Sequence, residues 1–167
     1  ISVLLDESVI ITNHHPVLHT LILGSCTKLG TLLGSVNIGL FIYTCIQTII
    51  LASTLSYTIS FLKSRGLNRK FLLTTLIIYT FVPVFPMYAI VPVKDVIFGC
   101  LIILYIIEIY KYIIVLEKPN IPRLLLLLVL IMLFRNNGFH IIILSLPFLL
   151  IPKNNGRKRI LFLVIFT

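Results

Sequence analysis

The sequence has few acidic residues, few charges of either sign and no tryptophan. Asp and Glu number 5 against 14 Lys and Arg, and only 11% of the 167 residues are charged. Hydrophobic residues make up 59% of the chain. A water-soluble domain with so few polar side chains could not cover its surface and would aggregate. The composition therefore excludes an ordinary soluble domain and indicates an integral membrane protein.

The apolar runs also lack the alternation of polar and apolar residues that a transmembrane strand requires. Residues 124–134 (LLLLLVLIMLF) and 162–166 (FLVIF) are apolar on every side. Such a segment can satisfy its backbone hydrogen bonds in hydrocarbon only as a helix. We predict an all-α integral membrane fold, a polytopic transmembrane helix bundle with an interfacial helix at its outer face and a short helical hairpin.

Two further functions are excluded by what is missing. The net charge is +9, but the basic residues lie in short connectors and form no stripe interleaved with exposed aromatic residues, so we expect no nucleic-acid partner. The cysteines are Cys26, Cys45 and Cys100, which lie in apolar surroundings without metal-type spacing. We expect all three to be small buried hydrophobic residues.

The chain begins with Ile1 and stops at Thr167 inside an apolar run, so we expect 1–167 to be a fragment of one polytopic membrane domain. No signal peptide is visible at its start. Apolar runs of about twenty residues mark the spans. The predicted segments are an outer loop with the interfacial helix at 1–36, spans at 37–62, 71–92 and 96–116, hairpin helices at 124–134 and 139–151, and the start of a further span at 160–167.

Two local features are predicted within the spans. The second half of 71–92 contains several prolines, which remove backbone donors, so this half should be kinked or unwound. Glu108 and Lys111 lie three residues apart on one face of the third span. We expect them to form a structural ion pair near one end of that helix.

The basic residues set the expected orientation, because cytoplasmic loops are enriched in Lys and Arg. The connectors 63–70, 117–123 (with nearby Lys111) and 153–159 hold eleven of the 14 Lys and Arg. If 124–151 is a hairpin, all three connectors lie on the cytoplasmic side. A single helix would instead bury Arg135 near mid-membrane, at a cost of several kcal/mol. We therefore predict a cell-membrane protein with cytoplasmic basic loops.

Under this topology three polar stretches lie at the extracytoplasmic face: HHPVLHT (14–20), Lys94–Asp95 and RNNG (135–138). Arg offers a planar fork and Lys a point charge, which suits a phosphate or pyrophosphate. A carboxylate beside them can act as a base or orient one. The candidate substrate-binding residues are His14, His15, His19, Lys94, Arg135, Asn136, Asn137 and His140, and Asp95 is the candidate catalytic residue.

A metal site is an alternative for the first stretch. His15 and His19 are four residues apart and would share a helical face, and Asp6, Glu7 or Asp95 could supply a third ligand. The spacing lacks the Glu of an HExxH motif and no cysteine set accompanies it. We assign no metal and no cofactor, and keep a divalent cation as the alternative.

The order of these motifs resembles the GT-C superfamily of polytopic glycosyltransferases, which use lipid-phosphate sugars. HHPVLHT resembles the KPPL-type start of the loop helix in the aminoarabinose- and mannosyl-transferase branch, and RNNGF resembles that branch's TKGP hairpin tip. The combination of HHPxxHT, KDxxF and RNNGF more closely resembles an uncharacterised bacterial multi-pass family near those enzymes, the family of domain of unknown function 6020.

The resemblance implies a glycosyltransferase that uses a polyprenyl-phosphate sugar donor at the extracytoplasmic face, with membrane lipid as its surroundings. Lys94, Arg135, His14 and His15 would hold the donor phosphate, and Asp95 would orient Lys94 or the acceptor. The sugar would contact Asn136, Asn137 and His140. GT-C enzymes place a catalytic Asp after their first span, so we expect the main base upstream of this fragment and the fragment alone to be inactive.

Two other functions fit the same residues. A transporter or flippase for an anionic lipid-linked substrate would use the cations as a binding site and the proline-broken span as a hinge. A non-catalytic multi-pass membrane protein would use the polar clusters as caps and anchors. The sugar, the acceptor and the stereochemical course do not follow from the sequence.

Overall fold

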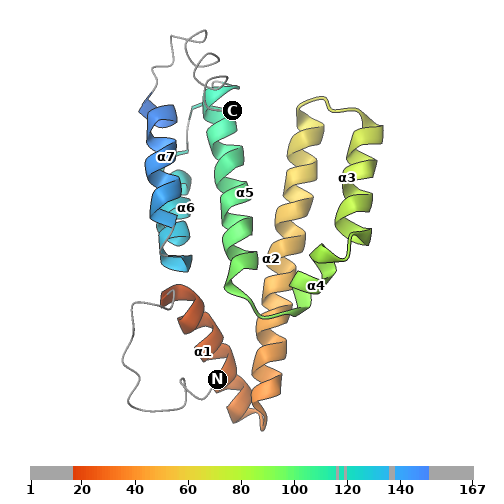
Figure 1. Ribbon diagram of the computed structural model, residues 1–167, viewed down its shortest axis with the longest axis vertical. Coiled ribbons are helices and arrows are strands. Elements are labelled where there is room, and N and C mark those ends of the chain that lie inside the picture. Colours follow the sequence, from red (N-terminus) through yellow and green to blue (C-terminus); the bar gives the residue numbers. More distant parts are fainter. Residues whose placement is uncertain (1–16, 116, 119, 136–137, 151–167) are drawn as a thin grey trace. The chain divides into compact units, whose positions relative to one another are not determined.

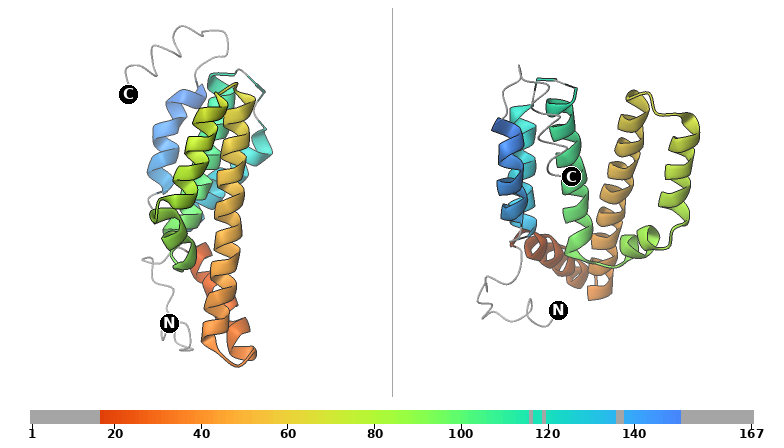
Figure 2. Two further views of the ribbon diagram at one scale, coloured as in Figure 1. Left: turned by 90° about the vertical axis from the view of Figure 1, so that its right-hand side faces the viewer. Right: turned by 45° about the horizontal axis from the view of Figure 1, so that its top comes forward.

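The computed structural model describes residues 17–115, 117–118, 120–135 and 138–150. All secondary structure in these residues is helical, as the all-α prediction requires. Figures 1 and 2 show the helices and their connections. The helices are α1 (Val17–Leu32), α2 (Val36–Ser64), α3 (Arg69–Phe81), α4 (Val84–Ile90), α5 (Lys94–Ile113), α6 (Ile121–Phe134) and α7 (Gly138–Leu150).

The chain divides into two compact units, Ile1–Cys100 and Leu101–Thr167, called unit 1 and unit 2 below. Unit 1 contains α1 to α4 and the first turns of α5. Unit 2 contains the rest of α5 with α6 and α7. Helix α5 crosses the boundary between them.

Among the described residues, two helices, α2 with 29 residues and α5 with 20, are long and apolar enough to cross a membrane. A third span is added if α3 and α4, which are bent by 49° at the break between them, count as one. These elements cover most of the predicted spans 37–62, 96–116 and 71–92. At about 1.5 Å per residue, a helix of twenty residues matches a hydrocarbon thickness of about 30 Å.

The predicted kink in the 71–92 segment is confirmed. Helix α3 ends at Phe81, Val82 is extended, and α4 begins after Pro83. Pro83 has no N–H to continue the ladder of α3, although its carbonyl accepts from the Met87 N–H at 3.0 Å. The segment is therefore two helices, and its last two residues lie beyond α4.

Three predicted helix starts need correction. Helix α5 begins at Lys94, so Lys94 and Asp95 lie in its first turn and not before it, and it ends at Ile113. Helix α6 begins at Ile121, because the Asn120 side chain accepts from the Arg123 N–H and a proline occupies the first turn. Helix α7 begins at Gly138, one residue earlier than predicted.

In unit 1, α1 and α2 form a tight hairpin. The end of α1 is a Schellman motif: the Ser35 N–H donates to Gly30 O at 2.9 Å, the Gly34 N–H donates to Thr31 O at 3.1 Å, and Gly34 has φ +99°. Ser35 then caps α2 through its hydroxyl, which accepts from the Asn37 N–H. The same arrangement, with Gly66 at φ +81°, ends α2 before α3.

In this hairpin, the backbones of α1 and α2 are in direct contact. A Cβ added to Gly39 would lie 2.3 Å from Cys26 O and 2.6 Å from Thr27 Cα, and one added to Gly30 would lie 2.2 Å from Gly39 N. Side chains cannot occupy these positions, so the glycines let α1 lie directly against α2 (Figure 1).

In unit 2, α6 and α7 lie side by side in both Figure 1 and Figure 2. Their contact is close at Gly138, where an added Cβ would lie 2.5 Å from Ile131 O. Tyr105 of α5 and Ser145 of α7 share a buried hydrogen bond of 2.5 Å between their hydroxyls. The predicted hairpin segments 124–134 and 139–151 thus correspond to separate helices, α6 and α7, which pack together. The RNNG stretch links them in the sequence.

Candidate functional site

His19 of α1, a predicted site residue, is hydrogen-bonded to Tyr43 of α2. The Tyr43 hydroxyl and His19 Nδ1 are 3.1 Å apart, and the two rings meet edge to face with centroids 5.7 Å apart. Tyr43 is fully buried, and His19 is half-buried. A hydrogen bond at Nδ1 restricts the imidazole to one ring orientation and couples its tautomer to the hydroxyl. His19 is therefore a fixed group and not a mobile surface side chain.

Gln47 of α2 is hydrogen-bonded to the carboxyl end of α4. Its Nε2 donates to Tyr88 O and Val91 O, both at 2.8 Å, and lies 3.3 Å from Ala89 O. The Thr48 hydroxyl adds a hydrogen bond to Ala89 O at 3.0 Å. The last carbonyls of a helix have no partner within the helix. Gln47 and Thr48 supply these partners from α2 and so fix where α4 ends.

The segment that follows carries Lys94 and Asp95. The Val93 N–H donates to Val91 O at 2.8 Å, which makes a tight turn, and α5 begins at the next residue. Lys94 is half-buried and Asp95 is exposed. A carboxylate in the first turn is favourable because the amino end of a helix carries partial positive charge. We call residues 91–95 the α4–α5 joint.

Tyr43 and Gln47 are four residues apart and therefore lie on the same face of α2, one turn from each other. Through them, His19 of α1 and the α4–α5 joint are attached to successive turns of one helix. Residues separated by about seventy-five positions in the sequence thus belong to one end of unit 1 (Figure 1).

Neither Tyr43 nor Gln47 was a sequence-based candidate. A signal was present, because two polar residues with i, i+4 spacing in a long apolar segment mark a face that contacts protein. That face also carries the other buried residues of α2, Gly39 and Thr54.

Arg135 and His140 belong to unit 2. Arg135 caps the end of α6 in an extended conformation and is half-buried; its N–H donates to Ile131 O at 3.2 Å. Its carbonyl accepts from the Gly138 N–H at 2.8 Å, so the start of α7 is fixed relative to the end of α6. His140 is exposed in the first turn of α7.

The remaining candidates have no described structure. His14, His15, Asn136 and Asn137 lie outside the residues that the structure describes. The convergence of all three polar stretches on one site stays a prediction, since His19, Lys94 and Asp95 are in unit 1 whereas Arg135 and His140 are in unit 2.

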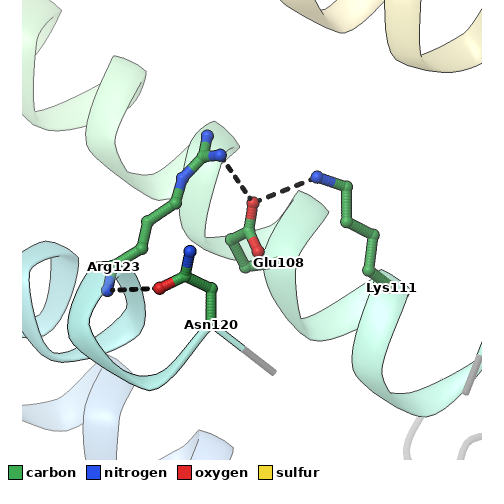
Figure 3. A network of polar contacts seen from close by, with 4 residues as sticks. All are labelled: Glu108, Lys111, Asn120 and Arg123. Atoms are coloured by element: carbon green, nitrogen blue, oxygen red, sulfur yellow. Dashed lines mark hydrogen bonds and ion pairs between the residues drawn. The ribbon is translucent and has the colours of Figure 1, made fainter. Parts of the chain in front are cut away.

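The predicted ion pair in the third span is confirmed, and a third charged residue joins it. Lys111 Nζ lies 3.1 Å from Glu108 Oε1, and Arg123 Nη1 of α6 lies 3.4 Å from the same oxygen (Figure 3). The Glu108 side chain is 9% exposed, against 20% for Lys111 and 41% for Arg123. The cluster ties α5 to the start of α6. We interpret it as structural.

In the described part of the chain, no group of three or more His, Cys, Asp or Glu side chains could hold a metal ion. The His15 and His19 pair is not tested, because His15 lies outside the described residues. Cys26 and Cys100 are buried, as expected, but Cys45 is partly exposed. Burial raises the pKa of the Cys26 thiol, so it is a poor nucleophile.

Comparison with known proteins adds one relationship. No curated protein and no solved structure matches this chain. A family defined from sequence alone does match, over residues 3–167, which is nearly the whole chain. It is the family that the HHPxxHT, KDxxF and RNNGF motifs indicated. The chain belongs to the DUF6020 family, a family of unknown function.

Proposed function

We propose that this chain is part of a multi-pass membrane enzyme that transfers a sugar from a polyprenyl-phosphate donor at the extracytoplasmic face. The observation that carries the proposal is the attachment of His19 and the α4–α5 joint to adjacent turns of α2. An imidazole, the Lys94 ammonium and the Asp95 carboxylate then share one end of unit 1. This set can bind a phosphate and move a proton.

A membrane location is supported by the surface of the described helices. Large apolar side chains are exposed on helices of both units, including Leu32 at 82%, Phe81 at 76% and Leu144 at 69%. Helix α3 has no buried residue at all. In water these surfaces would drive aggregation, whereas in hydrocarbon they cost nothing. The basic connectors 63–70, 117–123 and 153–159 would face the cytoplasm by the positive-inside rule.

The proposed mechanism assigns roles by chemistry. Lys94 would contact the donor phosphate and stabilise the charge that develops on it as the bond to the sugar breaks. Asp95 would orient Lys94 or accept the proton of the acceptor hydroxyl, and His19, held by Tyr43, would add a donor. For Arg135, Asn136, Asn137, His140, His14 and His15 we keep the substrate-binding roles that the resemblance implies. The resemblance of HHPVLHT and RNNGF to GT-C enzymes supports this choice of reaction.

Transfer of labelled sugar tests the proposal. The full-length protein in liposomes would be given a panel of polyprenyl-phosphate sugars, and transfer would be measured for Lys94→Ala and for the control Lys70→Ala. Lys70 is an exposed cation of the same type in the 63–70 connector. We expect Lys94→Ala to lower transfer by about a hundredfold or more and Lys70→Ala to leave it unchanged. Wild-type transfer by Lys94→Ala would refute the assignment.

A flippase for an anionic lipid-linked substrate is the second candidate, and the break between α3 and α4 favours it. Helices broken within a span frequently form the binding sites and hinges of transporters. The same liposomes separate the two functions. Movement of labelled lipid between leaflets without sugar transfer would identify a flippase, and the absence of both would favour a non-catalytic membrane protein.

A further inference from the structure

The Gln47 side chain has an unused acceptor. The residue is fully buried, and its Oε1 has no hydrogen-bond partner among the residues that the structure describes. Leaving a buried acceptor unsatisfied costs about 1–3 kcal/mol. Native proteins rarely keep such an atom unless a water or a ligand completes it.

The orientation of the amide is set by its surroundings. Nε2 lies within 2.8 Å of Tyr88 O and Val91 O and 3.3 Å of Ala89 O. Reversing the amide would place its oxygen against three carbonyl oxygens and lose both donors. Oε1 is therefore the atom that is left without a partner, and it can only accept a hydrogen bond.

The position of this acceptor points to the substrate. Val91, which Gln47 binds, starts the α4–α5 joint, and the Lys94 ammonium is three residues further on. One turn away on α2, Tyr43 holds His19. A neutral acceptor in apolar surroundings pairs best with a neutral donor, because an ion would have to lose its hydration to reach it. A hydroxyl group is such a donor, and a phosphate is not.

We propose that Gln47 Oε1 accepts a hydrogen bond from a hydroxyl of the sugar carried by the lipid phosphate, while Lys94 binds the phosphate. This inference rests on the proposed function and deepens it. Oε1 is enclosed in the present structure, so the hydroxyl reaches it only when a neighbouring element moves.

Displacement of a fluorescent polyprenyl phosphate from the full-length protein tests the inference. The competitors are the unlabelled polyprenyl phosphate and a panel of its hexosyl esters. The measured quantity is the ratio of the two affinities, which isolates the contribution of the sugar from that of the phosphate. We expect the wild type to bind at least one ester more tightly than the bare lipid.

Gln47→Met removes the acceptor with little change in volume. We expect it to reduce the affinity ratio about tenfold, the loss of one hydrogen bond to the sugar. It also removes the donors to Tyr88 O and Val91 O, so binding of the bare lipid is expected to weaken as well, and the ratio cancels that common change. Thr48→Val removes the other side-chain bond to Ala89 O without touching the acceptor, and should leave the ratio unchanged. If Gln47→Met does not fold, deoxy analogues of the preferred ester test the wild type, and removal of the bonded hydroxyl should abolish the preference.

The results separate the two proposals. Equal weakening of both lipids by Gln47→Met, a preference kept by every deoxy analogue, or a wild type without any preference for an ester would overturn the role of Gln47 and leave the lipid-phosphate site intact. A wild type that binds neither lipid would overturn the proposed function together with the inference.

Discussion

In unit 1, helices meet through backbone contact at Gly30 and Gly39 and through neutral hydrogen bonds from Tyr43 and Gln47. In unit 2, α5 is tied to the start of α6 by the Glu108 carboxylate and two cations. The polar residues of the two arrangements lie at different positions along their helices. Tyr43 and Gln47 lie well inside α2, whereas Lys111 is in the last turn of α5 and Arg123 in the first turn of α6.

The difference follows from the cost of desolvation. Removing a charged group from water costs several kcal/mol, and a neutral amide or hydroxyl costs much less once it is hydrogen-bonded. Charges can therefore be kept near helix ends, where Arg123 is still 41% exposed. Neutral groups can hold helices together deep in an apolar segment. The contact between α1 and α2 should accordingly respond to changes of shape, and the contact between α5 and α6 to changes of salt.

The largest effect is expected for Gly39→Ala. Its Cβ would lie 2.3 Å from a backbone oxygen of α1, so the two helices must separate. We expect a loss of about 3 kcal/mol in the free energy of unfolding. Chemical unfolding in detergent, followed by circular dichroism, would measure it. Gly99→Ala is the control, because nothing lies within 4 Å of its added Cβ; an equal loss in both variants would contradict the close contact.

The second effect concerns Glu108→Gln, which leaves Lys111 and Arg123 without their shared carboxylate. We expect a loss of about 2 kcal/mol at low salt, because the glutamate is nearly buried but its partners are partly screened. The same unfolding measurement at low and high salt should show the loss shrinking as salt rises. Glu117→Gln, at an exposed glutamate, should change little. A loss that is independent of salt would contradict an ionic cluster.

Tyr43→Phe should have a smaller effect. It removes only the hydroxyl that bonds to His19 Nδ1 and keeps the buried ring. We expect about 1 kcal/mol, the net value of a neutral hydrogen bond, with no dependence on salt. Tyr88→Phe, at an exposed ring of α4, is the matched control. If the Tyr43→Phe loss varies with salt as the Glu108→Gln loss does, the distinction between the units fails.

The smallest effect is expected for Arg123→Lys. The charge is kept, the planar fork is lost, and the side chain is 41% exposed. We expect less than about 0.5 kcal/mol in the free energy of unfolding. A loss as large as that of Glu108→Gln would show that the geometry of the guanidinium, and not its charge, ties α5 to α6.

Much of the secondary structure follows from local signals. Apolar runs predict α2 and α5, the glycines at 34 and 66 end helices at positive φ, and the prolines near 83 break the 71–92 segment. The Glu108 and Lys111 pair follows from i, i+3 spacing. The error at the start of α6 also has a local cause, since Asn120 caps α6 four residues before its apolar run begins.

The candidate site was only partly predictable. His19, Lys94 and Asp95 were candidates because polar residues are costly in an apolar chain, and that reasoning needs no tertiary structure. Arg123 joins Glu108 from another helix, and no spacing in the sequence connects these residues. Tyr43 and Gln47 were overlooked because aromatic and amide side chains inside an apolar run resemble ordinary helix residues.

The sequence by itself determined that this protein is a set of apolar helices with polar residues at a few positions, because helix formation and its termination depend on near neighbours. Only the tertiary structure decided which partners the polar residues find. Gln47 binds carbonyls 41 to 44 positions away, and Tyr43 binds an imidazole 24 positions away. Periodicity shows which face of α2 is polar, but the packing of the other helices decides what covers that face.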